Sequence, residues 1–166
     1  MPLGFWKKTG TFLVALNILL LAAAWMMALS SYPEVPATMA ARLGVFGWEF
    51  GPRAKSALFF VFPVIQTLLN LMAVAAGRLS ASGSRNFRLG ALRQERIYME
   101  MIFVNAILIH LQRNIISLAY LGESSFNRLY LAALGVILFL IYLYYRIRIR
   151  SEAVPKGPGA GAALWM

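Results

Sequence analysis

The chain has 166 residues, of which 60% are hydrophobic and only 13% are charged, with a mean hydropathy of +0.68 and a formal net charge of +10. Because a typical soluble chain has about 25% charged residues, this composition excludes an ordinary soluble domain and indicates a membrane protein. The sequence contains no cysteine, which excludes disulfides, zinc–thiolate sites, iron–sulfur clusters and thiol nucleophiles.

Four apolar segments follow one another along the chain and predict four membrane-spanning helices. They cover residues 11–29, 57–76, 97–121 and 129–145. Each has about the 17–25 residues that a helix needs to cross a hydrocarbon core of about 30 Å. We therefore expect an all-α, polytopic membrane protein with four transmembrane helices. The membrane domain would cover residues 1–150, and residues 151–166 would form a flexible cytoplasmic tail.

The first apolar segment shares features with a secretory signal peptide. Lys7 and Lys8 precede it, and the sequence Ala-Leu-Ser at residues 28–30 offers small residues for a cleavage site. Its apolar run is longer than the roughly 7–15 residues of a signal sequence. We therefore expect a retained helix.

The connection between the first two apolar segments is rich in proline, glycine and aromatic residues. This composition predicts an ordered outer loop that folds back on the bilayer. The loop contains Pro-Glu-Val-Pro at residues 33–36, then Gly47, then the stretch from Gly51 to Lys55, and it leads into an apolar segment that carries Pro63.

This pattern resembles a short element of the SdpI-like bacterial membrane proteins, over residues 32–68. Thr38 departs from it, because the family usually has histidine at that place. The resemblance implies a small helical membrane module. It also implies a receptor or immunity protein that binds a ligand through residues 33–55, with Glu49 and Lys55 as contacts.

The second apolar segment contains a proline and two amides. Pro63 lacks a backbone N–H, and its place inside the segment predicts a bend. Gln66 and Asn70 are one turn apart on the same helical face. We expect them to form polar contacts between helices.

The third apolar segment is interrupted by polar residues. Its stretch ILIHLQRNII, residues 107–116, contains His110, Gln112, Arg113 and Asn114. At 100° per residue, His110, Arg113 and Asn114 share one face of a helix, whereas Gln112 and Asn105 point the opposite way. An arginine at the bilayer centre costs between about 2.5 and about 17 kcal/mol. Arg113 must therefore have a partner or reach an interface.

Three interpretations of this polar helix remain open. In the first, Arg113 extends to a headgroup or to an outer carboxylate, and the polar side chains form hydrogen bonds between helices, with Gln66 and Asn70 as the partners of His110, Gln112 and Asn114. The outer carboxylates are Glu34, Glu49 and Glu123. In the second, the polar face meets a carboxylate, a phosphate or a cofactor propionate of a partner. In the third, His110 is a ligand or a proton carrier, although one histidine cannot build a bis-histidine haem within one protomer.

The basic residues predict the orientation of the helices. Eleven of the sixteen Lys and Arg residues lie in the N-terminal segment, in the connection between the second and third apolar segments, and in the tail. By the positive-inside rule, both termini and the connection between the second and third apolar segments face the cytoplasm. We expect the helices to lie in the cytoplasmic (inner) membrane of a bacterium. These residues suit anionic headgroups, and no recognition motif for nucleic acid accompanies them.

No combination of residues predicts catalysis. The sequence has no aspartate, and Glu100 and His110 lie ~15 Å apart along one helix. We expect a non-catalytic accessory or scaffold subunit without a cofactor, which packs against a larger membrane complex through its third helix and outer loop. Its partners would be other membrane protein subunits and lipids. The alternatives are the receptor or immunity protein described above, and a small transporter or proton path through His110 and Arg113.

Overall fold

The computed structural model describes residues 3–39, 53–54, 57–84, 86–121 and 128–153. Within these residues the chain forms four long helices, α1 (Leu3–Ser31), α2 (Val61–Ser82), α3 (Phe87–Leu121) and α4 (Arg128–Ala153). Two 3-10 helices, η1 (Tyr32–Glu34) and η2 (Ala57–Phe60), follow α1 and precede α2. Two strands of two residues each, β1 (Thr38–Met39) and β2 (Arg53–Ala54), pair antiparallel between them.

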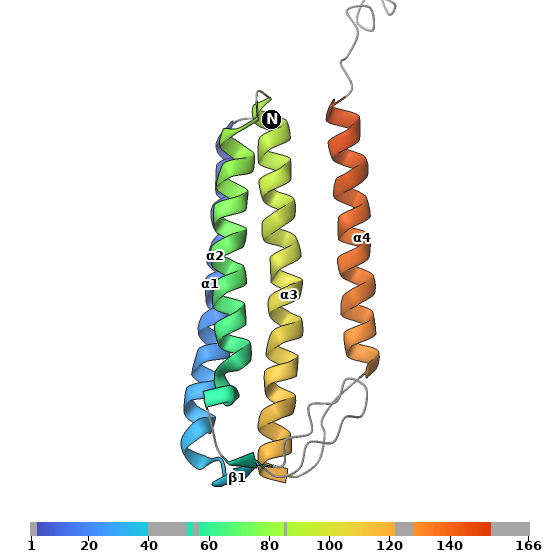
Figure 1. Ribbon diagram of the computed structural model, residues 1–166. Coiled ribbons are helices and arrows are strands. Elements are labelled where there is room, and N and C mark those ends of the chain that lie inside the picture. The colour runs from blue at the N-terminus through green and yellow to red at the C-terminus, as the bar shows by residue number, and fades with distance from the viewer. Residues whose placement is uncertain (1–2, 40–52, 55–56, 85, 122–127, 154–166) are drawn as a thin grey trace, which may run out of the picture.

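The four helices run up and down in chain order, and α3 has the central position (Figure 1). Helices α1, α2 and α3 pack against one another, and α4 packs mainly against α3. Three stretches of the described helices are long and apolar enough to cross a membrane, Thr9–Glu34, Val61–Ser82 and Leu129–Glu152. The structure is thus an all-helical bundle that fits a membrane-embedded protein, with its most polar long helix in the middle.

The start of α2 corrects the prediction for Pro63. The apolar segment was expected to be one helix from residue 57, but residues 57–60 form η2 and the α-helix begins at Val61. Pro63 therefore lies in the first turn of α2, where backbone N–H groups have no acceptor within the helix. Its missing N–H interrupts no helical hydrogen bond, so the physical reason for the predicted bend is gone.

Helix α3 begins ten residues before the apolar segment that predicted it, at Phe87 instead of Ile97. Asn86 ends the short turn after α2, and its side-chain Oδ1 accepts hydrogen bonds from the backbone N–H groups of Arg88 (3.0 Å) and Leu89 (3.4 Å). This is the N-terminal cap that a polar residue supplies to unpaired N–H groups. Most of the basic connection is consequently helical.

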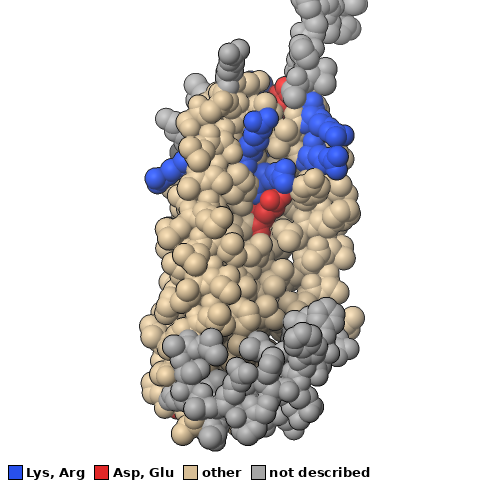
Figure 2. All heavy atoms as spheres, in the orientation of Figure 1, with Lys and Arg blue, Asp and Glu red and all other residues tan. Residues whose placement is uncertain are grey.

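Arginine side chains gather at the end of the bundle where α1 begins and α4 ends (Figure 2). They come from the end of α2, the start of α3 and the last turns of α4. The described members of this basic end are Arg78, Arg88, Arg93, Arg96, Arg146, Arg148 and Arg150. Two acidic side chains, Glu95 and Glu100, lie on the same stretch of α3.

At the opposite end, a small apolar core joins α1, α3 and the residues before α2. Its buried members are Ala28, Val35, Phe59, Ile115 and Ala119. The Tyr120 hydroxyl donates a hydrogen bond to the backbone oxygen of Ser31 at 2.7 Å, which ties the end of α3 to the end of α1. Beside this core, β1 and β2 bring the two ends of the 40–52 segment together, with Thr38 opposite Ala54.

Candidate functional site

The polar residues of α3 are divided between two faces. One face points into the three-helix core and carries Asn105 and Gln112, both fully buried. The other face points toward α4 and carries Glu95, Arg96 and His110, which all contact tyrosines of that helix. Helix α3 therefore has one polar surface toward the core that it shares with α1 and α2, and a second one toward α4, which packs less closely.

Three asparagines, one from each of α1, α2 and α3, form a hydrogen-bonded cluster in the core. Asn105 Nδ2 donates to Asn17 Oδ1 at 2.8 Å and to Asn70 Oδ1 at 3.3 Å, and Asn70 Nδ2 donates to Asn105 Oδ1 at 2.9 Å. Asn17 Nδ2 also donates to the backbone oxygen of Tyr98 on α3, at 3.0 Å. Where water is excluded, such satisfied amides hold neighbouring helices in one register.

Two glutamines lie nearer the other end of the same core. Gln112 Nε2 donates to the backbone oxygen of Phe59 at 3.2 Å, so it links α3 to η2. The Gln66 side chain is 0% exposed, and neither its Oε1 nor its Nε2 has a hydrogen-bond partner among the described residues. Gln112 lacks a partner only at its Oε1, whereas burying Gln66 costs free energy without any compensating side-chain hydrogen bond among the described residues.

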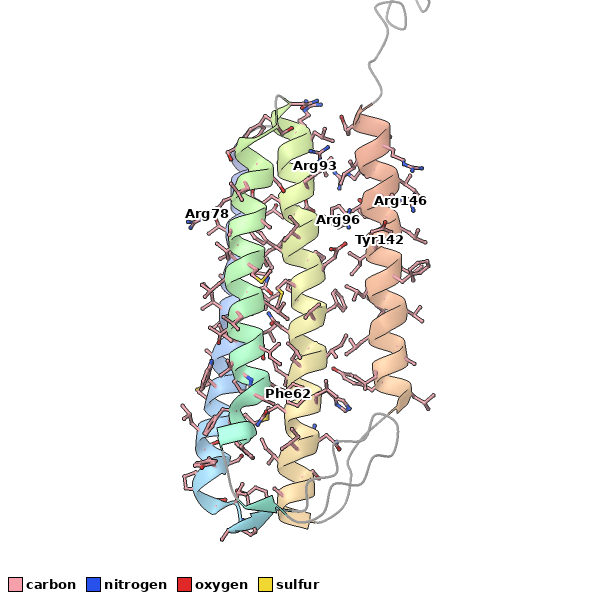
Figure 3. All side chains as sticks on the ribbon, viewed as in Figure 1. Phe62, Arg78, Arg93, Arg96, Tyr142 and Arg146 are labelled. Carbon is pink, nitrogen blue, oxygen red and sulfur yellow. The ribbon has the colours of Figure 1, made fainter. Side chains whose placement is uncertain are left out.

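Polar contacts join α3 to α4 near the basic end (Figure 3). The Tyr145 hydroxyl donates to Glu95 Oε1 at 2.7 Å. Arg96 Nε forms an ion pair with Glu100 Oε1 at 2.7 Å, and the Arg96 guanidinium lies 4.6 Å from the centre of the Tyr142 ring. Through these contacts Arg96 is held between its own helix and α4.

Closer to the opposite end, the two helices meet again through an aromatic contact. The His110 ring on α3 lies 4.7 Å from the Tyr130 ring on α4, centre to centre, with the ring planes tilted by 43°. Arg113, one turn further on, is exposed. The described carboxylates lie elsewhere, because Glu95 and Glu100 have the partners given above, Glu34 lies 3.3 Å from the Tyr120 hydroxyl, and Glu152 is in the last turn of α4, at the basic end.

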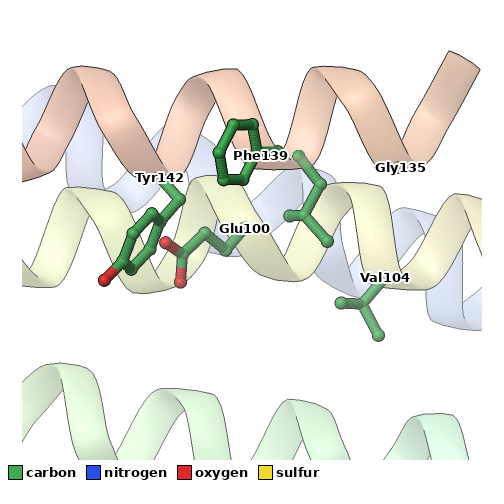
Figure 4. A pocket seen from close by; sticks show the side chains of 6 residues that line it. Glu100, Val104, Gly135, Phe139 and Tyr142 are labelled. Atoms are coloured by element: carbon green, nitrogen blue, oxygen red, sulfur yellow. The ribbon is translucent and has the colours of Figure 1, made fainter.

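A cavity of about 390 Å³ lies between these two sets of contacts, and it is open along one side (Figure 4). Its lining residues are Glu100, Val104, Gly135, Leu138, Phe139 and Tyr142. Glu100 and Tyr142 lie together at one end of the cavity, whereas Val104 and Gly135 lie toward the other end. The cavity is therefore mostly apolar, with a polar group at the end that faces the arginines.

The predicted site residues are only partly brought together. Asn70 bonds to Asn105, and Gln112 bonds to the backbone oxygen of Phe59, instead of the pairing expected from sequence between Gln66 or Asn70 and the polar stretch of α3. His110 lies against Tyr130 of α4, Arg113 is exposed, and Asn114 is half-buried. The predicted ligand contacts Glu49 and Lys55 lie outside the described residues.

Sequence reasoning missed the contacts between α3 and α4 and the asparagine cluster. A usable signal for the cluster was that each of the first three apolar segments contains asparagine, Asn17 in the first, Asn70 in the second, and Asn105 together with Asn114 in the third. The Glu95–Tyr145 contact had no such signal, because Glu95 lies before residue 97, outside the apolar segments that predicted the helices. Among the described residues, no group of three or more His, Cys, Asp or Glu side chains is placed to hold a metal ion.

Comparison of the chain with protein-family models, with curated proteins and with solved structures finds no match in any of the three. What the protein does must therefore be inferred from the contacts described above.

Proposed function

We propose that this chain is a four-helix protein of the bacterial cytoplasmic membrane, with both termini in the cytoplasm. Three helices satisfy the length and composition of a membrane span, and α3 runs beside them, antiparallel to α2 and α4 and parallel to α1. Its 35 residues reach ~50 Å, more than the ~30 Å of a hydrocarbon core. The basic end supports the orientation, because Lys and Arg are enriched on the cytoplasmic side of membrane proteins.

Within that membrane, the proposed function is that of a non-catalytic accessory or scaffold subunit of a larger membrane protein complex. One observation carries this proposal: Arg113 is exposed on the central helix, in the half of α3 that lies away from the basic end. It is about eight residues, or ~12 Å, from the end of the helix at Leu121. A charged side chain at that depth needs a partner, a cavity or a headgroup.

Among the described residues, no carboxylate forms an ion pair with Arg113: Glu34, Glu95 and Glu100 have other contacts, and Glu152 lies at the basic end of α4. A carboxylate on a helix of a neighbouring subunit would match the guanidinium through charge-assisted hydrogen bonds. Charged and polar residues inside membranes commonly face the interior of a helix bundle, where they pair with one another. We therefore place the contact with the larger complex on the Arg113 side of α3.

The proposal is tested by purifying the tagged protein in a mild detergent and measuring the mass and stoichiometry of the complex that it forms. We expect a discrete complex with other membrane subunits. Arg113→Leu should lower the recovered partner by about tenfold, the loss that ~1.4 kcal/mol of binding free energy produces. Arg78→Leu is the matched control, because Arg78 is an exposed arginine at the basic end of α2 and should leave recovery unchanged.

Two outcomes would contradict the proposal. The first is a wild-type protein that remains a monomer or homodimer in every detergent that extracts it. The second is an Arg113→Leu variant that retains its partner as well as the wild type does. The thermal unfolding temperature of each purified variant separates a lost contact from a lost fold.

An alternative proposal is an SdpI-like receptor or immunity protein that binds a ligand through the outer loop. It is favoured by the pairing of β1 with β2, which holds the two ends of the 40–52 segment together beside the buried Val35. A loop with fixed ends can present a binding surface at a lower entropic cost. Sensitivity to a secreted peptide toxin that changes with Glu49→Gln or Lys55→Gln, but not with Arg113→Leu, would favour this alternative over the subunit.

A further inference from the structure

We propose that the cavity between α3 and α4 is a binding site for one anionic phospholipid, with an acyl chain between the helices and the phosphate on the arginines at the basic end. This site requires that the protein is embedded in a membrane. It does not require the partner subunit proposed above, so the two proposals fail independently.

The two helices are held apart at the cavity by contacts on either side of it. The Tyr145–Glu95 hydrogen bond of 2.7 Å lies beyond one end, and the contact of His110 with Tyr130 at 4.7 Å lies beyond the other. Between them α4 has a glycine, Gly135, and a Cβ atom added there would meet no atom within 4 Å. The space is therefore bounded by fixed contacts.

The size and lining of the cavity suit a hydrocarbon chain. Its volume of about 390 Å³ falls within the roughly 300–1,000 Å³ that ligand pockets occupy. Val104, Leu138 and Phe139 present apolar side chains to it. In a bilayer an open apolar groove fills with lipid, because water would lose its hydrogen bonds there.

The acyl chain by itself would not make binding selective for one lipid, because a lipid tail meets an equally apolar surface beside leucine and beside another tail. Selectivity comes from the polar end. Arg96 uses its Nε for Glu100, and its two terminal nitrogens have no hydrogen bond within the described residues. Arg93 and Arg146 lie nearby on the two helices, with their side chains toward the same end (Figure 3). Guanidinium groups in this arrangement bind phosphate through paired hydrogen bonds.

The position of this charge also fits a lipid. Basic pockets between membrane helices on the cytoplasmic side are sites for anionic headgroups. The two carboxylates in the region, Glu95 and Glu100, each have a partner already, the Tyr145 hydroxyl and the Arg96 guanidinium. Glu100 marks the boundary between the arginines and the apolar lining (Figure 4). A site with arginines on one side of Glu100 and an apolar lining on the other matches a phospholipid, whose headgroup is charged and whose acyl chain is apolar.

The test uses the full chain in nanodiscs that contain phosphatidylglycerol and phosphatidylcholine in equal amounts, followed by native mass spectrometry of the lipid that stays bound. We expect the wild type to retain phosphatidylglycerol in preference to phosphatidylcholine. Gly135→Leu fills the cavity and should lower retained lipid by about tenfold. Gly10→Leu is the matched control, because a Cβ at Gly10 on α1 also meets no atom within 4 Å, so retention should not change.

A second pair of variants tests the headgroup contact. Arg96→Gln should bring the ratio of retained phosphatidylglycerol to phosphatidylcholine close to one, whereas Arg78→Gln should leave it as in the wild type. In the wild-type chain, phosphatidylglycerol with a photoreactive diazirine in its acyl chain should form adducts at Val104, Leu138 or Phe139, a result that depends on no substitution.

The proposal is overturned by any of three results. The first is equal retention of lipid by the Gly135→Leu variant and the wild type. The second is a wild type without preference for the anionic lipid. The third comes from a variant with a photoreactive amino acid in place of Leu138, irradiated in the native membrane: this side chain captures a protein chain, either a partner helix or a second copy, instead of lipid.

Discussion

Each of the three packed helices contributes one amide to a closed set of hydrogen bonds. Asn105 lies at the centre of this set and contacts both Asn17 and Asn70. The cost of burying three amides is offset because each has partners, as buried polar groups in native structures generally do. The cluster therefore fixes the positions of α1, α2 and α3 relative to one another along their axes. Apolar contacts alone would not fix these positions.

Asn105→Leu should lower the free energy of unfolding by about 1–2 kcal/mol, because it leaves the amides of Asn17 and Asn70 buried with fewer partners. The measurement is reversible unfolding of the purified protein in mixed micelles as the fraction of denaturing detergent rises. An unchanged midpoint would show that the cluster contributes nothing to the fold.

Gln66→Leu is the contrasting variant in the same experiment. Its amide is buried without a hydrogen bond among the described residues, so an apolar side chain of similar size should leave the free energy of unfolding unchanged or raise it by about 1 kcal/mol. Opposite effects of two buried amides in one core would distinguish a specific network from a general tolerance of polar residues. A marked loss of stability would mean that Gln66 has a partner beyond the described residues.

Much of this detail is beyond what the sequence can predict. The amides were recognisable as residues that need partners, because a polar group in a membrane helix must be satisfied. Which amide meets which depends on the vertical offset between helices. The unpredicted start of α2 at Val61 and of α3 at Phe87 shows that this offset is not readable from hydropathy.

At the level of elements, α2 and α3 approach closely where a glycine faces a tyrosine. A Cβ atom at Gly77 would lie 2.7 Å from the Tyr98 ring, closer than real contacts allow. Tyr98 is buried, and its backbone oxygen accepts the hydrogen bond from Asn17. The tyrosine therefore cannot move aside without disturbing the neighbouring amide contact. Small residues serve this purpose at many helix contacts in membranes.

Gly77→Ala should destabilise the protein by about 1–3 kcal/mol, the usual cost of overpacking a closely fitted contact. The same detergent titration measures it. Gly10→Ala is the control, because nothing lies within 4 Å of a Cβ there and alanine is the better helix former by about 1 kcal/mol. Equal stability of the two variants would mean that α2 and α3 are not in the close contact described here.

The apolar segments located the helices, but the arrangement of the elements was not accessible from them. Charged residues before Ile97 concealed the first ten residues of α3, since a hydropathy pattern registers lipid-facing surface and not helical propensity. The division of α3 into a face toward α1 and α2 and a face toward α4 was indicated by its polar periodicity. The tyrosines of α4 that contact Glu95 and His110 were not indicated by the sequence.

For the whole molecule, the most informative feature is the contrast between a compact group of three helices and a fourth helix that packs mainly on one of them. The basic end, the asparagine core and the exposed Arg113 follow one another along α3 in that order. With the roles proposed above, the central helix has a charged end that binds headgroups, an interior tied by amides and a cation that meets a neighbouring subunit. The proposed roles of the basic end and of Arg113 both require that α3 crosses the bilayer.

That crossing can be measured directly, because the chain has no cysteine and single cysteines can be introduced without background. In intact bacterial cells, a membrane-impermeant maleimide should label Ala37→Cys and Ser125→Cys, which precede α2 and follow α3. It should label Ser84→Cys, between α2 and α3, only after the cells are permeabilised. Labelling of Ser84→Cys and Ser125→Cys from the same side would contradict the account, since α3 would then not span the membrane.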